Sequence, residues 1–194
     1  NLKTILRLLK KEKIILVTSV EAITRKYVPK KIILDNIFKL KVGQTMDMQD
    51  LARRLVDLGY QRVSKVEGFG QFSMRGGIID VFTLMYNFPL RLEFFDDEID
   101  SIREFDIYSQ KSIDKFKSVT ITPSRDFIYP DDVGGAVEKI RAEVNDITDS
   151  DVFRNMEKIG AKEYFDGLEN YIDYMYDGQD KSLFEYLADD SLIF

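Results

Sequence analysis

Four β-rich runs follow one another between residues 60 and 105, and they constrain the fold more than any other feature of the chain. Each is rich in β-branched and aromatic residues: Tyr60–Val66, Gln71–Phe82, Leu90–Phe95 and Ile99–Phe105. The links between them are short and contain turn-forming residues: Glu67–Gly70, Met85–Pro89 and Asp96–Glu98. Because short links join neighbouring strands that run in opposite directions, the pattern predicts one antiparallel sheet.

A helix is predicted directly before this sheet. Asp47 is a good N-cap residue, Leu51, Leu55 and Leu58 fall on one stripe at helical spacing, and Gly59 is placed to end the helix. An amphipathic helix next to an antiparallel sheet buries its apolar stripe on one sheet face. Residues 45–123 are therefore predicted to form a small α+β domain, with Ser118–Pro123 as the strand that leaves it.

The sequence patterns at the two ends of the chain predict a different fold class, α/β. Leu2, Ile5 and Leu9 recur at helical spacing, and Ile14–Val17 is a short apolar run typical of a strand inside a parallel sheet. The further predicted elements are a helix at Glu21–Tyr27, an extended segment at Ile32–Val42, helices at Asp131–Val144, Asp149–Ile159, Tyr164–Tyr176 and Leu183–Leu187, and the opening of a buried strand at Ser191–Phe194.

The fold class that follows is α/β, with a discontinuous α/β domain at residues 1–44 and 124–194 and the small α+β domain of residues 45–123 inserted between its halves. The chain starts on Asn1 and stops on an apolar run, so we expect it to be a piece of a longer protein.

Three residue types are missing from the 194 residues, and their absence narrows the chemistry. Without His or Cys the chain can form no Ser-His-Asp triad, no thiolate nucleophile, no Cys/His zinc site and no disulfide, and it also lacks Trp. The absence of disulfides fits a cytoplasmic location. The apolar stretch Ile14–Val20 is far shorter than the ~20 residues that span a bilayer, so no membrane association is expected.

Charge is distributed unevenly along the chain, whose net charge is −6. Residues 1–31 hold nine basic and two acidic side chains, whereas residues 126–194 hold eighteen acidic and six basic ones. Both runs are compatible with solvated helix faces. A nucleic acid would be repelled by the acidic C-terminal third, which argues against a DNA-binding module.

The sequence gives little support for a nucleotide-binding site or for a catalytic pair of carboxylates. Leu92–Glu98 superficially resembles a strand ending in Asp-Glu, but it lies in a predicted hairpin, and the chain has no G-x-x-x-x-G-K-[ST] phosphate loop. The glycines at 68, 70, 76 and 77 have the wrong spacing for a dinucleotide loop and are interpreted as hairpin and bulge positions. No carboxylate pair stands out, so neither a catalytic residue nor a cofactor or metal site is predicted in the chain.

The segment Gln71–Phe82 carries the strongest prediction of a binding surface. In strict alternation Phe72 and Met74 face one way and Arg75 the other, so Arg75 projects from the face opposite the core helix. Together with Arg62 and Arg91 it could form a small guanidinium patch, a group suited to protein interfaces because it binds carboxylates bidentately. Alternatively, each arginine pairs with a carboxylate on a neighbouring strand: Glu67, Glu93 or Glu104.

Several segments of the sequence resemble the UvrB-like module of the bacterial transcription-repair coupling factors, the Mfd family. The segments that carry the resemblance are Gly59–Val63, Val66–Gly68, Gly70–Phe72, Arg75–Phe82 (RGGIIDVF), Arg91–Arg103 (RLEFFDDEIDSIR) and Phe105–Asp106. The resemblance extends upstream through Ile15–Ile23 and downstream through Gly167–Tyr171 and Ser182–Leu187, so it covers most of the chain. The corresponding fragment of the related excision-repair protein UvrB is the alternative. Ser73 departs from the UvrB pattern, which has two arginines flanking one residue on this strand.

The resemblance implies a non-catalytic module that recruits the repair protein UvrA in transcription-coupled nucleotide excision repair. Carried over by position, the UvrA contact would be made by Arg62 and Arg75, with Phe82 and Arg91 as weaker candidates. The family's full-length proteins are ATP-driven double-stranded DNA translocases that displace stalled RNA polymerase. The resemblance thus places ATP and magnesium in motor domains outside this chain, and it leaves open a further domain that masks the UvrA-binding surface.

Overall fold

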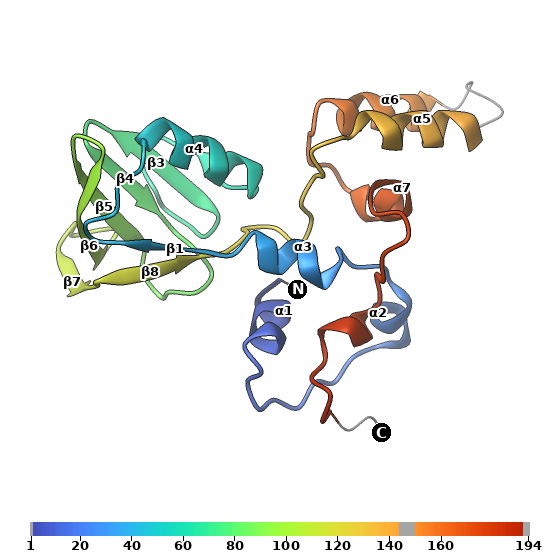
Figure 1. Ribbon diagram of the computed structural model, residues 1–194, viewed down its shortest axis with the longest axis horizontal. Coiled ribbons are helices and arrows are strands. Elements are labelled where there is room, and N and C mark those ends of the chain that lie inside the picture. Colours follow the sequence, from blue (N-terminus) through green and yellow to red (C-terminus); the bar gives the residue numbers. More distant parts are fainter. Residues whose placement is uncertain (1, 144–149, 192–194) are drawn as a thin grey trace. The chain divides into compact units, whose positions relative to one another are not determined.

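The computed structural model describes residues 2–143 and 150–191. Contacts divide the chain into two compact units (Figure 1). Residues 1–3 and 31–128 form the first, which we call the sheet unit, and residues 4–30 and 129–194 form the second, which we call the helical unit. Almost all of the sheet unit is one uninterrupted stretch of chain, flanked in sequence by the two segments of the helical unit. The chain is mixed α/β, as predicted.

Six strands form the main sheet, in the spatial order β2-β3-β4-β5-β6-β7. Their bounds are β2 (Gln61–Arg62), β3 (Gln71–Arg75), β4 (Ile78–Val81), β5 (Leu90–Phe95), β6 (Glu98–Phe105) and β7 (Ser112–Lys115). All neighbours from β3 to β7 are antiparallel. Two further strands, β1 (Phe38–Lys41) and β8 (Ser118–Ile121), form a separate antiparallel pair.

The predicted helix before the sheet is confirmed as α4 (Met48–Asp57). The Asp47 side chain accepts hydrogen bonds from the backbone N–H groups of Gln49 and Asp50, at 2.8 and 3.0 Å, which satisfies two of the free donors of the first turn. Gly59 follows the last turn with φ +84°, the left-handed conformation that glycine adopts without steric cost.

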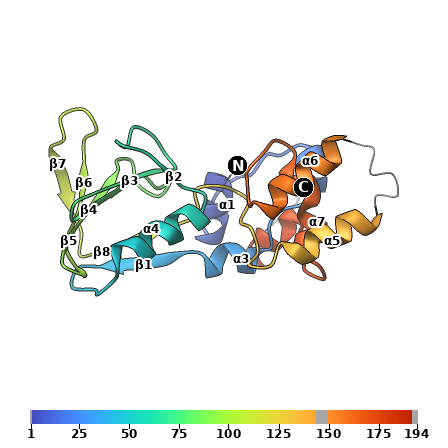
Figure 2. The same cartoon turned by 90° about the horizontal axis from the view of Figure 1, so that it is seen from above.

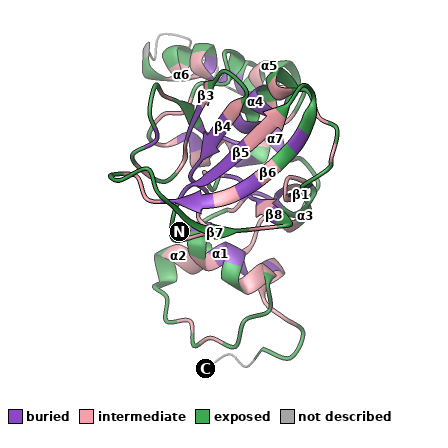
Figure 3. Cartoon of the chain, turned by 90° about the vertical axis from the view of Figure 1, so that its left-hand side faces the viewer, coloured by how far each residue is buried: buried purple, intermediate pink, exposed green. Residues whose placement is uncertain are grey.

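The core of the sheet unit lies between α4 and one face of the sheet. It contains Leu51, Leu55 and Leu58 from the helix stripe, and alternate strand residues face them: Phe72, Ile79, Val81, Leu90, Leu92 and Ile102. Figure 3 shows the result, with β4 and β5 mostly buried and the edge strand β7 exposed along its length. The period-2 alternation of the strands therefore leaves the opposite sheet face to polar residues.

Three predictions for the sheet need correction. Residues 71–82 form two strands rather than one, because Gly76, with φ +56°, and Gly77 make the turn of a tight hairpin and not a bulge. The run from Tyr60 to Val66 keeps only the two-residue β2, which runs parallel to β3 instead of antiparallel. Strand β7 was not predicted, since three of the four residues of Ser112–Lys115 are polar and all four are exposed.

Short helices make up most of the rest of the chain. They are α1 (Leu2–Leu9), α2 (Val20–Thr24), α3 (Lys30–Asp35), α5 (Gly134–Glu143), α6 (Ser150–Gly160), the 3-10 helix η1 (Leu168–Tyr171), α7 (Ile172–Met175) and the 3-10 helix η2 (Leu183–Tyr186). Within the helical unit the two distant segments interlock, because Lys26 pairs with Asp173 and the Lys30 backbone N–H donates to Glu185.

The strand predicted at Ile14–Val17 is wrong. These residues lie in neither a helix nor a strand, and Ile15 and Val17 are 94% and 88% exposed. A strand needs neighbours that satisfy its backbone N–H and C=O groups, and no described strand pairs with this run.

The segment Ile32–Val42, predicted as extended, is helical in its first part (α3) and extended only in β1. Leu192–Phe194 lie outside the described residues, and Ser191 is in no strand.

Candidate protein-interaction surface

The face of the main sheet that points away from α4 carries a patterned set of polar side chains, which we call the polar face. Cross-strand pairing aligns the residues of this face in two rows: Ser73, Asp80, Arg91 and Arg103 in one, and Arg75, Glu93 and Ser101 with the apolar Ile78 in the other. Residues directly opposite one another on neighbouring strands share a face, so β3 to β6 contribute to one continuous surface.

Arg91 and Asp80 form a buried, bidentate ion pair at the centre of the polar face. The Arg91 Nε donates to Asp80 Oδ1 at 2.7 Å and its Nη2 to Oδ2 at 2.8 Å, and each side chain is only 9% exposed. The guanidinium also lies 4.1 Å above the centre of the Phe105 ring. Hydrogen bonding to Asp80 raises the pKa of Arg91 against the opposing effect of burial, so the arginine stays charged and fixed in place.

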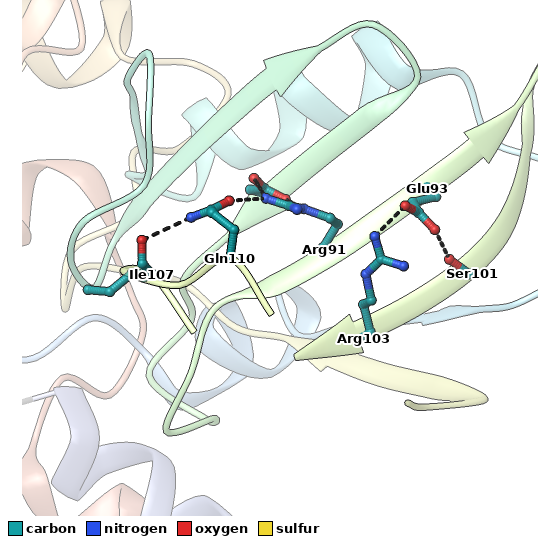
Figure 4. Close-up of polar contacts among 7 residues, drawn as sticks. Arg91, Glu93, Ser101, Arg103, Ile107 and Gln110 are labelled. Carbon is teal, nitrogen blue, oxygen red and sulfur yellow. Dashed lines mark hydrogen bonds and ion pairs between the residues drawn. The ribbon is translucent and has the colours of Figure 1, made fainter. Parts of the chain in front are cut away.

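A second, half-buried group of side chains joins the two rows of the polar face. Glu93 accepts a hydrogen bond from the Ser101 hydroxyl at 2.5 Å and pairs with Arg103 at 2.5 Å (Figure 4). The side chains of Arg103 and Glu93 are 26% and 29% exposed. The predicted alternative, pairing of Arg62, Arg75 and Arg91 with Glu67, Glu93 or Glu104, had the wrong partner for Arg91, which pairs with Asp80 on the neighbouring strand, while Glu93 pairs with Arg103.

Arg75 differs from these paired residues. It ends β3 at the tight hairpin, is exposed, and makes no ion pair within the described ranges 2–143 and 150–191. Its position on the face opposite α4 is as the alternation predicts, because Phe72 lies in the core and Met74 packs against it. A free guanidinium on a rigid strand can bind a carboxylate of another molecule.

The other three predicted contact residues do not join Arg75 in one patch. Arg62 is exposed, but the pairing register places it next to Phe72, in the row that belongs to the core side of the sheet. Arg91 is held in the buried pair described above. Phe82 is 7% exposed and its ring packs against Phe69, 4.2 Å between ring centres, so only Phe69 of this pair presents much surface to solvent.

The described part of the chain contains no group of three or more Asp or Glu side chains that could hold a metal ion. Every buried side-chain nitrogen and oxygen described has a hydrogen-bond partner. No helix among the described residues is long and apolar enough to cross a membrane. The chemistry that the polar face offers is the binding of anionic groups by exposed cations, which lie beside ion pairs that are fixed on the sheet.

Sequence reasoning missed Asp80 and Gln110 as parts of this framework. Asp80 interrupts an otherwise apolar strand, and a carboxylate at such a position is a signal for a buried partner. Gln110 accepts a hydrogen bond from Arg91 Nη2 at 2.8 Å, across 19 positions of sequence, and no sequence pattern indicates it.

Comparison with known proteins identifies the sheet unit. Residues 38–127 match the family model of the UvrB interaction domain. The chain is 35% identical over 189 residues to a transcription-repair-coupling factor of Myxococcus xanthus, covering 90% of the chain and 16% of that protein. It is 33% identical over 206 residues to the transcription-repair-coupling factor of Bacillus subtilis, covering 100% of the chain and 17% of that protein. It is 36% identical over 171 residues to that of Staphylococcus haemolyticus, covering 82% of the chain and 14% of that protein. The chain thus spans about a sixth of the length of these relatives.

Proposed function

Because residues 38–127 are a UvrB interaction domain and the chain around them is a UvrB-like segment of the transcription-repair-coupling factor family, we propose that this chain is a non-catalytic module that recruits UvrA. The observation that carries the proposal is the contrast on the polar face. Arg91 and Arg103 are neutralised by carboxylates of the same sheet, while Arg75 stands exposed and without an ion-pair partner among the described residues.

Such a surface favours an acidic protein partner. An exposed guanidinium gains most from a carboxylate that it can hold with two parallel hydrogen bonds. Arg62 is also exposed, at the sheet edge beside Phe72 rather than on the polar face, and would supply a weaker contact at the rim of the interface. Phe82 and Arg91 contribute indirectly, by supporting Phe69 and the centre of the polar face.

The role of the longer protein is proposed from the relatives. They are transcription-repair-coupling factors, and we infer that this chain serves transcription-coupled nucleotide excision repair in the cytoplasm. ATP and magnesium, RNA polymerase and double-stranded DNA would be bound by other parts of that protein, one of which could also mask the polar face. The chain itself needs no cofactor for recruitment.

Calorimetric binding of the chain to purified UvrA, at two salt concentrations, tests the proposal. Arg75→Ala should weaken binding by about 2 kcal/mol and Arg62→Ala by less, and both effects should shrink as salt screens exposed charges beyond ~10 Å at 0.1 M. Arg53→Ala is the matched control, because Arg53 is an exposed arginine on α4 whose charge is already paired with Asp50.

Two results would contradict the proposal. The first is the absence of binding, and the second is binding that Arg75→Ala and Arg53→Ala leave equally strong. ATP hydrolysis by the purified chain that survives repurification would show an enzyme instead. Tight DNA binding with a steep salt dependence would show a nucleic-acid-binding module.

A further inference from the structure

The turn between β6 and β7, residues 106–111, is held by several internal hydrogen bonds. The Asp106 carboxylate accepts from the Ser109 N–H at 2.7 Å and from its hydroxyl at 2.8 Å. The Gln110 N–H donates to the Asp106 carbonyl at 2.8 Å, and the Gln110 side-chain amide donates to the Ile107 carbonyl at 2.9 Å. These bonds fix one backbone conformation of a six-residue segment at the surface.

The turn is also fastened to the polar face. Arg91 Nη2 donates to the Gln110 side-chain oxygen at 2.8 Å (Figure 4). The same guanidinium is held by Asp80 from β4. Since Arg91 and Asp80 lie in one row of the polar face, Gln110 anchors the turn over that face, on the side of the sheet that also carries Arg75.

Tyr108 stands at the tip of this fastened turn and is 88% exposed. In Figure 2 the turn projects from the same end of the sheet as the segment after β2. A single exposed aromatic side chain is not remarkable in itself. An exposed tyrosine on a fixed backbone is different, because its ring offers a large contact area and the cost of ordering the chain on binding has already been met by the turn.

Tyr108 and Arg75 are close enough to meet one partner. Three strand spacings separate Arg75 from β6. Tyr108 lies beyond Phe105, which is itself four residues along β6 from Ser101 in the Arg75 row, so the distance from Arg75 to Tyr108 is on the order of 25 Å. A standard protein interface covers about 800 Å² on each side, which corresponds to a patch about 30 Å across. Both residues can therefore lie within one interface of ordinary size.

We propose that Tyr108 is a second anchor for the protein partner that binds Arg75, and that Gln110 and Arg91 are the positioning residues that present it. This inference rests on the proposed recruitment of UvrA. The partner surface would carry carboxylates opposite Arg75 and an apolar socket, with a hydrogen-bond acceptor at its base, for the tyrosine ring and hydroxyl.

Calorimetry of the whole chain with purified UvrA tests the anchor. Tyr108→Ala should raise the Kd about tenfold to thirtyfold, the loss typical of a tyrosine at the centre of an interface. Tyr108→Phe should keep most of the affinity. Phe153→Ala is the matched control, since Phe153 is a half-exposed aromatic residue on α6 of the helical unit, and it should leave the Kd unchanged.

A double-mutant cycle tests the positioning role. Gln110→Ala should raise the Kd about threefold to tenfold in the wild-type background and should have no further effect in the Tyr108→Ala background, because its contribution passes through the tyrosine. Additive losses would show that Gln110 contacts the partner itself or stabilises the sheet generally, and they would overturn the positioning role.

The outcomes for Tyr108 and for the proposed function can be separated. If the wild-type chain binds UvrA and Arg75→Ala weakens binding while Tyr108→Ala stays within twofold of wild type, the anchor is refuted and the proposed function stands. If the wild-type chain does not bind UvrA, both fail. A urea midpoint equal to that of the wild type confirms that each variant is folded.

Discussion

Replacing Asp80 with alanine should destabilise the sheet unit by about 3 kcal/mol. The substitution removes both hydrogen bonds of the Arg91 guanidinium to Asp80, at 2.7 and 2.8 Å, at a site where the arginine side chain is 9% exposed. A buried charge that loses its partner typically costs about 3–5 kcal/mol. The lower end applies here, because Arg91 keeps its bond to Gln110 and its contact with the Phe105 ring.

Hydrogen exchange of the full-length chain is the suitable assay, since two units need not unfold together. The slowest amides of β4 and β5 report the stability of the sheet unit, and 3 kcal/mol corresponds to a loss of protection of about 100-fold. Asp80→Leu combined with Arg91→Met should recover most of this loss, because a buried ion pair is often no more stable than an apolar pair of similar volume.

The solvent-exposed pair Arg53–Asp50 provides the control, and Arg53→Ala should change stability by less than about 0.5 kcal/mol. A loss below about 1 kcal/mol for Asp80→Ala would refute the reasoning. It would mean that water or a shifted side chain replaces the carboxylate at little cost, and that the polar face is not the rigid framework described above.

Three further predictions concern stability and pH. Asp47→Ala should lower the urea stability of the sheet unit by about 1 kcal/mol, because two amide donors of α4 lose their acceptor. Burial raises the pKa of Glu104, so the charged form of Glu104 lowers the stability of the folded chain at neutral pH. Glu104→Gln should therefore raise the melting temperature at pH 7. It should have no such effect below about pH 4, where Glu104 is protonated in both the folded and the unfolded chain. Burial also raises the pKa of Tyr60 to about 12, so stability present below pH 10 should fall as the pH rises from 10 towards 12, and Tyr60→Phe should flatten that fall in alkaline unfolding curves.

Local signals were sufficient to predict much of the sheet unit. Asp47 and Gly59 mark the two ends of α4 because N-caps and left-handed C-terminal residues act within one turn of chain. The two faces of β3 follow from its alternation, which placed Phe72 in the core and Arg75 on the polar face. Such features depend only on neighbours in sequence, which explains why they could be read without the structure.

Features that depend on pairing between distant segments could not be predicted. The partner of Arg91 is Asp80 because the β4–β5 register sets them opposite each other, and several carboxylates on nearby strands were equally plausible from spacing alone. The parallel pairing of β2 with β3 depends on the path of residues 63–70 between them, and the contact of Gln110 with Arg91 depends on how the β6–β7 turn packs on the sheet. Ile14–Val17 has the composition of a strand, but a strand forms only where neighbouring strands pair with it, and composition does not show whether such neighbours exist.

The charge balance of the polar face distinguishes between the possible classes of partner. Asp80 neutralises Arg91 and Glu93 neutralises Arg103, which leaves Arg75 on β3 and Lys115 on the edge strand β7 as its exposed cations. A nucleic acid is bound tightly only when many phosphates are neutralised at once, and each contact adds to the dependence on salt. Two separated cations on a face that is otherwise neutral cannot provide this, but they can select a few carboxylates on a complementary protein surface. The paired arginines neutralise carboxylates that would otherwise repel such a partner, so removing Arg103 and leaving Glu93 unpaired should weaken recruitment even where Arg75 is intact.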